Sequence, residues 1–279
     1  RVDLGDGGTP TRFLLALATR AAESVVVDGS PRMRERPIDE GVALLRRLGA
    51  DLRGTMVDGV ERLPVTVEVG PARDLEGGKL EVGRTASSQF LSALLLIAPT
   101  IRHGLELRYA ERPTSESYLE LTVDAMRLVG LAVDVDRGAD GRLLAHRVPP
   151  SPIEAFDRQV EADASSAAYF AVAAAITPGG RVRLEGVPAT SVQPDLALLD
   201  ALRAMGATVT RDATSIEIVG PRELRPFEGD AAQFPDASLA LAAACSRARG
   251  ISRIAGLATL AVKESDRIAA LASELTKLG

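Results

Sequence analysis

Leu44-Leu45-Arg46-Arg47-Leu48-Gly49-Ala50 carries a helix-ending pattern, closed by glycine, that returns three more times along the chain. The later copies are Ala125-Met126-Arg127-Leu128-Val129-Gly130-Leu131, Leu202-Arg203-Ala204-Met205-Gly206-Ala207 and Leu275-Thr276-Lys277-Leu278-Gly279. Each glycine suits the left-handed position that ends a helix, and a strand-like stretch follows each of the first three. The interval of roughly 75 to 80 residues is long for a solenoid repeat and suits a compact module of several strands and two helices.

A second pattern keeps the same interval and marks helix starts. Small polar residues or glycine precede apolar, helix-favouring runs, and such residues cap the exposed N–H groups of a first turn. These starts lie at 8–13, 87–90, 165–170 and 235–238. Strand candidates lie at 25–27, 65–69, 80–82, 105–109, 182–184 and 216–219. We therefore predict an α/β (α+β) fold whose modules run strand, helix, strand, helix, strand, strand.

The most proline-dense stretch of the chain is Val148-Pro149-Pro150-Ser151-Pro152. Such composition is typical of a boundary or hinge between domains. We place a hinge near 148–160, between a first lobe at 1–155 and a second lobe at 156–279, each holding parts of two modules. A plain surface loop is the alternative interpretation.

The composition is that of an ordinary globular protein, with 46% apolar and 25% charged residues among 279. The net charge of −5 argues against a general nucleic-acid binder. No apolar run is long enough to cross a bilayer, so we expect no membrane partner and a cytoplasmic protein. Cys245 lies in an apolar run, which favours a buried free thiol, and His103 and His146 have no neighbouring metal ligands. These residues give no indication of a metal site.

Asp28-Gly29-Ser30-Pro31-Arg32-Met33-Arg34-Glu35-Arg36-Pro37 places three arginines between two prolines. Because proline fixes its own φ and restricts the residue before it, the segment is interpreted as a stiffened loop rather than a helix. A guanidinium held in place matches the oxygens of a carboxylate or phosphate. A solvated charged loop is the alternative.

Three further motifs carry groups that could bind or move charge. The stretch 87–89 (Ser-Ser-Gln) adds two hydroxyls and an amide to a helix start, where N–H donors favour anions. The glycine loop 5–9 lacks the lysine of a P-loop and the spacing of a dinucleotide fingerprint. If a helix begins near Lys263, then Lys263 and Arg267 lie one turn apart with Glu264 beside them, and the two cations could bind a phosphate. The alternative is that these charges only pair with one another. Asp236 is either a helix cap or a buried general base.

Together these motifs resemble one family. The segments 28–37, 87–94 (Ser-Ser-Gln-Phe-Leu-Ser-Ala-Leu), 161–170 (Glu-Ala-Asp-Ala-Ser-Ser-Ala-Ala-Tyr-Phe), 235–237 (Pro-Asp-Ala) and 262–267 (Val-Lys-Glu-Ser-Asp-Arg) occur in the order and spacing of 5-enolpyruvylshikimate-3-phosphate synthase. The resemblance runs from Leu4 to Gly279. It implies a two-domain enolpyruvyl transferase fold, each domain having three βαβαββ units, around a cleft.

The resemblance implies transfer of the enolpyruvyl group of phosphoenolpyruvate to the 5-hydroxyl of shikimate 3-phosphate, with release of phosphate, by a monomer without cofactors. The implied shikimate 3-phosphate contacts are Ser87, Ser88, Gln89, Ser115, Asp236, Thr259 and Lys263, with Tyr118 near them. The implied phosphoenolpyruvate contacts are Gly8, Arg32, Gln89 and Arg267, with Arg12 as a supporting charge. The implied catalytic groups are Asp236 as the base, Glu264 as the group that exchanges protons with the methylene carbon, and Lys263.

The chain departs from the family pattern in several places. Asp6 and Gly7 replace the usual Asn-Ala before Gly8, and Thr259 replaces an asparagine. The family's N-terminal Lys-Ser segment and its C-terminal Arg and Lys have no counterpart, so we expect a piece of a longer protein that is inactive or very weak alone. Two rivals stay open. One is UDP-N-acetylglucosamine enolpyruvyl transferase, which would need a reactive loop cysteine, and the other is a non-catalytic anion-binding fragment.

Overall fold

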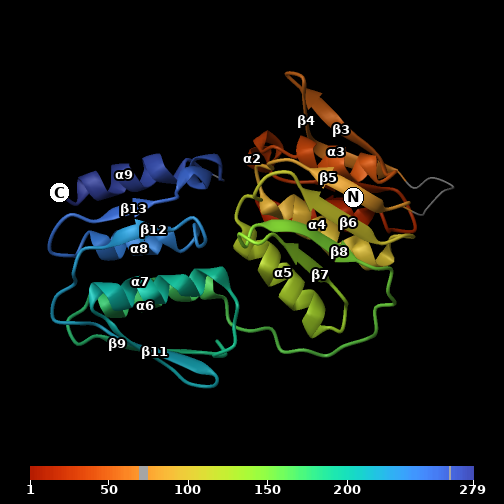
Figure 1. The fold of residues 1–279 in the computed structure, drawn as a ribbon. Helices are drawn as coiled ribbons and strands as arrows, with labels where there is room; N and C mark the ends of the chain where they lie inside the picture. Colours follow the sequence, from red (N-terminus) through yellow and green to blue (C-terminus); the bar gives the residue numbers. More distant parts are fainter. Residues whose placement is uncertain (69–74, 264) are drawn as a thin grey trace. The chain divides into compact units, whose positions relative to one another are not determined.

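The computed structural model describes residues 1–68, 75–263 and 265–279 and divides into two compact units, Arg1–Phe156 and Asp157–Gly279 (Figure 1). Each unit has its own hydrophobic core of buried aliphatic side chains. Among the helices built from described residues, none has the length and apolar character that a membrane crossing requires.

The first module of unit 1 forms a four-stranded sheet of order β1-β2-β4-β3. β1 runs parallel to β2, and the other pairs are antiparallel, so that Val27 of β2 pairs with Val2 on one side and Val65 on the other. The elements are β1 (Val2–Asp3), α1 (Gly8–Ala18), β2 (Val25–Asp28), α2 (Pro31–Glu35), α3 (Asp39–Arg47), β3 (Asp51–Val57) and β4 (Val60–Glu68).

The second module repeats this topology in a sheet of order β5-β6-β8-β7. Again the first two strands are parallel and the remaining pairs antiparallel, with Leu107 of β6 between Leu80 and His146. The elements are β5 (Gly78–Val82), α4 (Ser88–Ile97), the 3₁₀ turn η1 (Ala98–Thr100), β6 (Leu105–Tyr109), α5 (Glu116–Leu128), β7 (Asp134–Arg137) and β8 (Leu143–Val148). Both modules of unit 1 are therefore βαβαββ units, which confirms the predicted order of elements.

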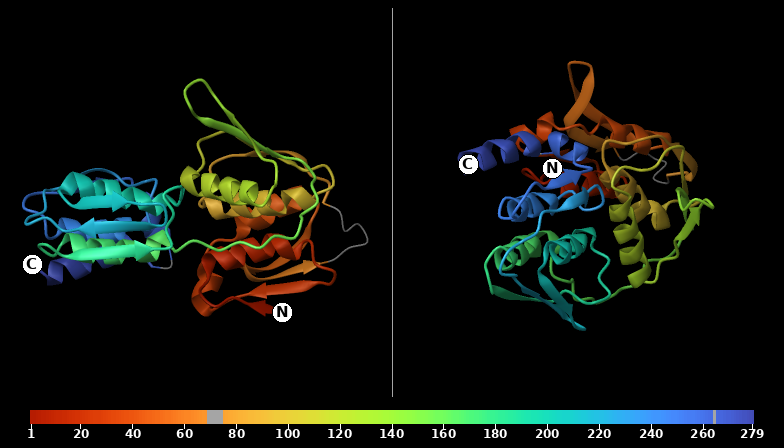
Figure 2. Two further views of the ribbon diagram at one scale, coloured as in Figure 1. Left: turned by 90° about the horizontal axis from the view of Figure 1, so that it is seen from below. Right: turned by 60° about the vertical axis from the view of Figure 1, so that its left-hand side comes forward.

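The helices of unit 1 pack side by side, α1 against α4 and α4 against α5 (Figure 2). α4 is apolar around most of its circumference, and only Gln89 and Leu96 of its ten residues are not buried. A helix with so little polar surface is stable only when neighbours cover it, so α4 forms the centre of this unit.

Unit 2 holds two incomplete versions of the same module. The first gives a three-stranded antiparallel sheet of order β10-β11-β9, which matches the last three strands of a βαβαββ unit. The second gives the parallel pair β12-β13, which matches the first two strands. The elements are α6 (Ala164–Ala175), β9 (Arg181–Glu185), η2 (Pro194–Ala197), α7 (Leu198–Met205), β10 (Thr208–Arg211), β11 (Ser215–Val219), β12 (Glu228–Asp230), α8 (Ser238–Cys245), β13 (Arg253–Ala255), η3 (Ala258–Val262) and α9 (Arg267–Lys277).

The repeated glycines adopt the conformation predicted for them. Gly49, Gly130, Gly206 and Gly279 have φ angles of +100°, +84°, +111° and +99°, in the left-handed region where a side chain is disfavoured. The strand candidates also form strands, with Val69 at the end of one of them outside the described residues.

The prediction that 28–37 contains no helix is wrong. Pro31–Glu35 forms the short helix α2, because Ser30 accepts a hydrogen bond from the Met33 N–H and proline is compatible with the first helical position. The helix ends at Glu35, since Arg36 precedes a proline and is extended, at φ −77° and ψ 147°.

Candidate functional site

The helix starts of unit 1 lie next to one another. Gln89, in the first turn of α4, donates from Nε2 to Thr9 Oγ1 of α1 at 2.6 Å. Thr114, just before α5, donates to the Thr85 carbonyl, just before α4, at 2.7 Å. The first turns of α1, α4 and α5 therefore gather at one end of the unit, where their N–H groups and partial positive charge favour an anion.

Three predicted serines lie at two of these helix starts. Ser87 caps α4 by accepting from the Gln89 N–H at 3.3 Å, and Ser88 is its buried first residue. Ser115 precedes α5 in a left-handed conformation, φ 52°, and its side chain makes no capping bond. Tyr118 is half-buried in the first turn of α5, and its N–H bonds to the Ser115 carbonyl. The Thr114–Thr85 bond brings these two groups onto neighbouring loops.

Gly8, the first residue of α1, lies against the guanidinium of Arg36. A Cβ atom at Gly8 would meet Arg36 Nη1 at 2.3 Å, so only glycine leaves room for this arginine. Arg36 is 6% exposed. The sequence-based interpretation assigned Arg32 to this site, but the Arg32 side chain is half exposed and donates to Glu35 Oε2 at 2.5 Å. The structure therefore adds Arg36 to the predicted set, and its position just before Pro37 was the signal available in the sequence.

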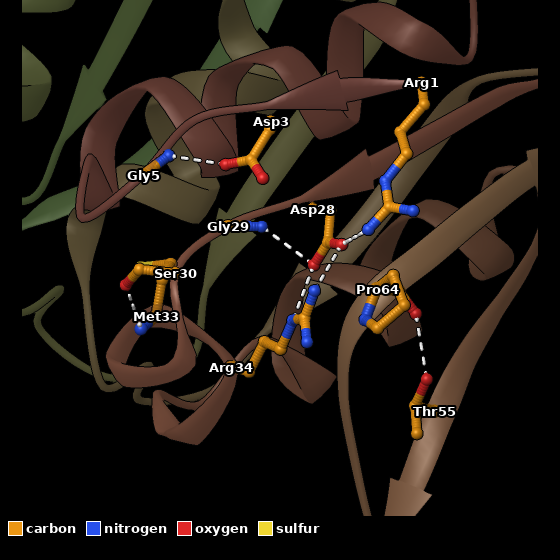
Figure 3. A network of polar contacts seen from close by, with 10 residues as sticks. All are labelled: Arg1, Asp3, Gly5, Asp28, Gly29, Ser30, Met33, Arg34, Thr55 and Pro64. Atoms are coloured by element: carbon orange, nitrogen blue, oxygen red, sulfur yellow. Dashed lines mark hydrogen bonds and ion pairs between the residues drawn. The ribbon is translucent and has the colours of Figure 1, made fainter.

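A buried carboxylate fixes α2 and the segment that carries Arg36 (Figure 3). Asp28, at the end of β2, is fully buried and accepts from Arg34 Nε at 2.9 Å and Nη2 at 2.7 Å. The Gly29 N–H and Arg1 donate to the same carboxylate. The hydrogen bonds from Arg34 lower the pKa of Asp28 to about 2, so this carboxylate is ionised at neutral pH.

Asp6 is the residue that departs from the family's asparagine beside the glycine loop. The Ser30 hydroxyl donates to its carboxylate, and the Ser30 N–H donates to the Gly5 carbonyl at 3.0 Å. Ser30 also caps α2. The carboxylate of Asp6 thus ties the glycine loop to the start of α2.

Arg12 lies in the interior of unit 1, 5% exposed. Its Nη1 donates to Gln89 Oε1 at 2.5 Å and its Nη2 to the Pro37 carbonyl at 3.3 Å, while its guanidinium carbon lies 4.9 Å from the centre of the Phe90 ring. The predicted supporting charge therefore contacts the predicted ligand-binding amide directly.

In unit 2, two cations converge on one carboxylate oxygen. Lys263 Nζ lies 3.2 Å and Arg267 Nη1 2.7 Å from Asp236 Oδ1, and all three side chains are about one-quarter to one-third exposed. Asp236 precedes α8 and does not cap it, because the capping position is Ala237. A carboxylate held in this way is the kind of group that can accept a proton from a hydroxyl.

The condition considered for the sequence, a helix that begins near Lys263, is not met. α9 begins at Arg267, because Asp266 accepts from the N–H groups of Ile268 and Ala269 and so caps the first turn. Lys263 precedes the helix in an extended conformation and reaches Asp236 from there. The two cations meet on Asp236, although they do not share a helix face.

A cavity of about 650 Å³ opens beside this cluster. Its polar lining comes from α6, from the cluster, from the residue before the α9 cap and from α9; these residues are Ser165, Ser166, Tyr169, Asp236, Ser265, Arg267 and Glu274. Asp163 caps α6 by accepting from the N–H groups of Ser165 and Ser166. A few polar groups in a mainly apolar wall are typical of a site that orients a small ligand.

Asp195, which sequence reasoning did not single out, joins the helix starts of unit 2. It lies in η2, leading into α7, and is 4% exposed. One carboxylate oxygen accepts from the Ser165 hydroxyl of α6, and the other from the Ala237 N–H before α8, at 3.1 Å. Asp195 therefore fixes the backbone directly after Asp236.

Two predicted residues lie near Lys263 in sequence. Thr259 is in η3, and its Oγ1 is buried without a hydrogen-bond partner in the part of the chain that the structure describes. Glu264 lies outside the described residues, so its predicted role stays a prediction. Cys245 is a half-buried free thiol of α8, and burial raises its pKa, unlike the reactive loop cysteine that the rival transferase would need.

Within residues 1–68, 75–263 and 265–279, no group of three or more His, Cys, Asp or Glu side chains could hold a metal ion.

Comparison with known proteins identifies similar chains. The family profile of EPSP synthase (3-phosphoshikimate 1-carboxyvinyltransferase) matches residues 1–279. The 3-phosphoshikimate 1-carboxyvinyltransferases of Syntrophobacter fumaroxidans and Shewanella amazonensis are 40% identical over 277 residues and 37% identical over 278 residues, respectively. Each alignment covers 99% of this chain, but only 63% and 62% of the relative. The EPSP synthase structure from Acinetobacter baumannii matches with a TM-score of 0.74 and 28% identity, over 97% of this chain and 60% of that one.

Proposed function

The chain belongs to the EPSP synthase (3-phosphoshikimate 1-carboxyvinyltransferase) family, and on that premise we propose that it serves the family reaction. In that reaction the enolpyruvyl group of phosphoenolpyruvate is transferred to the 5-hydroxyl of shikimate 3-phosphate, and phosphate is released. The step belongs to the shikimate pathway to chorismate and aromatic amino acids. The observation that carries the proposal is Asp236, held by Lys263 and Arg267 at the wall of a cavity.

The proposed chemistry has an addition step and an elimination step. In the addition, the 5-hydroxyl oxygen bonds to C2 of phosphoenolpyruvate, Asp236 accepts the hydroxyl proton, and the carboxyl of Glu264 gives a proton to the methylene carbon. In the elimination, the bond from C2 to the phosphate oxygen breaks, and the new methyl group returns a proton, which restores the double bond. Lys263 and Arg267 stabilise the negative charge that moves during both steps.

The proposed substrate contacts follow from the chemistry of the site residues in the two units. Shikimate 3-phosphate would be bound by Ser87, Ser88, Gln89, Ser115, Asp236, Thr259 and Lys263. Phosphoenolpyruvate would be bound by Gly8, Gln89, Arg267 and Arg36. Arg32, which the family resemblance implies, stays a prediction. Helix starts, hydroxyls and guanidinium groups suit phosphate and carboxylate oxygens. The buried Thr259 hydroxyl supports a polar ligand beside Lys263.

Titration calorimetry tests the proposal. We expect the chain to bind shikimate 3-phosphate and not UDP-N-acetylglucosamine, and Ser88→Ala to weaken the binding of shikimate 3-phosphate. Binding of UDP-N-acetylglucosamine alone would favour the rival transferase, and binding of neither would contradict the proposal. A phosphate-release assay measures turnover by the chain alone, which we expect to be absent or very weak. The monomeric state and the cytoplasmic location stay proposals, which sedimentation and cell fractionation test.

A further inference from the structure

The Gln89 side chain has two ends of opposite hydrogen-bonding character. Its Oε1 only accepts and its Nε2 only donates, and rotation by about 180° exchanges them at little intrinsic cost. The proposed ligands present phosphate and carboxylate oxygens, which accept hydrogen bonds. Gln89 can therefore assist their binding only when Nε2 faces the ligand.

Arg12 selects this orientation of the Gln89 amide. An arginine side chain carries five N–H donors and no acceptor, so the atom of Gln89 that contacts it must be Oε1. The structure places Arg12 Nη1 2.5 Å from Gln89 Oε1, and Gln89 Nε2 points to Thr9 Oγ1 at 2.6 Å. With Nε2 at Arg12, two donors would face each other beside a guanidinium that is only 5% exposed.

Arg12 is itself held in place. It is 5% exposed, donates from Nη2 to the Pro37 carbonyl and lies over the Phe90 ring. Pro37 follows Arg36, and Phe90 follows Gln89, so one guanidinium contacts both segments that carry proposed phosphoenolpyruvate ligands. A planar fork with several donors can make these contacts at once, which the single ammonium of lysine cannot.

We infer that Arg12 is a positioning residue that fixes the Gln89 amide with its N–H groups toward the anion beside Gly8. The inference rests on the proposed function for the identity of that anion, shikimate 3-phosphate or phosphoenolpyruvate. The orientation itself is a property of the ligand-free chain. It can therefore be tested separately from binding.

The first measurement is nuclear magnetic resonance of the Gln89 side-chain amide in the ligand-free chain, assigned by its loss in Gln89→Met. We expect a heteronuclear NOE typical of a rigid group, which falls to that of a mobile side chain in Arg12→Met. Gln193 is the rigid reference, because its amide accepts from the Ala164 N–H and donates to the Ala162 carbonyl, both at 2.8 Å. Exposed Gln159 is the mobile reference.

Arg46→Met is the matched control. Arg46 also donates to a carbonyl, that of Leu52, and to a side chain, Glu61, in the same unit, and these bonds do not involve Gln89. We expect this variant to lose stability and leave the Gln89 amide signal unchanged. Should Arg12→Met fail to fold, Arg12→Lys replaces it, with an intermediate NOE expected. An unchanged Gln89 signal in the folded Arg12 variant would overturn the inference.

The second measurement is a double-mutant cycle in the affinity for shikimate 3-phosphate. Arg12→Met and Gln89→Met should each raise Kd about tenfold, which corresponds to one charge-assisted hydrogen bond. The double variant should be no weaker than Gln89→Met alone, because Arg12 acts through that amide. Additive losses would overturn the inference. Absence of binding by the parent chain would overturn the proposed function, while the amide signal alone would then decide the role of Arg12.

Discussion

Gly8 determines whether Arg36 can occupy its place, because a β-carbon there would lie 2.3 Å from Nη1 of the guanidinium. Gly8→Ala must therefore displace the arginine. We expect at least a tenfold higher Kd for phosphoenolpyruvate, measured with shikimate 3-phosphate present, since a charge-assisted bond is worth about 1.5 to 3 kcal/mol. The free energy of unfolding should change by less than about 1 kcal/mol.

Gly83→Ala is the matched control for this substitution. Nothing lies within 4 Å of a Cβ at Gly83, and its backbone is not in the left-handed region. The Gly83→Ala variant should bind phosphoenolpyruvate with the same affinity as the parent chain. If Gly8→Ala bound phosphoenolpyruvate as tightly as Gly83→Ala, Arg36 would have no place in the proposed site.

His146 makes folding sensitive to acid. It is 1% exposed, its Nδ1 lies 2.7 Å from the Tyr109 hydroxyl, and burial lowers its pKa from 6.5 to about 4. Above pH 6.5 the imidazole is neutral in both states. Between 6.5 and 4 only the unfolded chain binds the proton, so the free energy of unfolding falls by about 3 kcal/mol over this window.

Urea unfolding at pH 7 and pH 4.5 measures this effect, with His146→Gln as the comparison. The carboxylates contribute equally to both proteins, so the difference in pH dependence belongs to His146. We expect the parent chain to lose more stability than the variant on acidification. Parallel losses would show that His146 does not contribute.

At the scale of the residue, the sequence identified which side chains belong to the site better than it identified where they lie. The motifs predicted Gly8, Gln89, Asp236 and Arg267 as site groups, and the structure places them in two clusters, one in each unit. Arg32 and Arg36 have the same side chain four positions apart, so composition could not separate them. The different positions of the two arginines depend on where α2 ends. Pro37 ends the helix before Arg36, and the result of this effect is visible only in the folded chain.

The helices of unit 2 depend on Asp195, which accepts bonds from the starts of α6 and α8 while it leads into α7. Asp195→Ala would leave the Ala237 N–H buried without its acceptor and remove the partner of the Ser165 hydroxyl. We expect a loss of about 2 to 4 kcal/mol in the free energy of unfolding, measured with urea. Asp195→Asn keeps an acceptor oxygen and should lose less.

Asp200→Ala, on α7, serves as the comparison, because the Asp200 side chain is 68% exposed and pairs with Arg203 at the surface. Exposed pairs of this kind contribute at most about 1 kcal/mol. A loss in Asp195→Ala no larger than in Asp200→Ala would remove the proposed link between the helix starts.

At the scale of the element, the sequence predicted most helix ends and strands, because these depend on neighbours along the chain. The left-handed glycines follow from local sterics, and they were placed correctly. The start of α9 was misplaced, since Lys263 and Arg267 suggested a shared face while the cap was Asp266. Asp195 was missed, because its two partners, Ser165 and Ala237, become its neighbours only after unit 2 has folded.

At the scale of the whole molecule, the division into two cores predicts that unit 1 folds independently. Its two modules are complete, and its core contains no residue of unit 2. We expect a fragment of residues 1–156 to unfold cooperatively in urea and to give a dispersed amide spectrum. A fragment that stays disordered would show that unit 1 needs the rest of the chain.

The sequence also predicted the repeat itself, since four glycines at similar intervals are visible without a structure. What it did not define is which parts of each module the chain contains. Strand pairing is a long-range property, so the reduction from four strands to three or two in unit 2 became visible only through the sheet order.

The three-stranded sheet of unit 2 has a further consequence for how copies of the chain behave in solution. Among the described residues, β9 lies at the edge of its sheet and pairs with β11. An edge strand is a template for edge-to-edge association and fibril growth. Arg181, Arg183 and Glu185 alternate along this strand and are exposed. Stacking a second copy would desolvate these charges, so the alternation acts as a gatekeeper against aggregation.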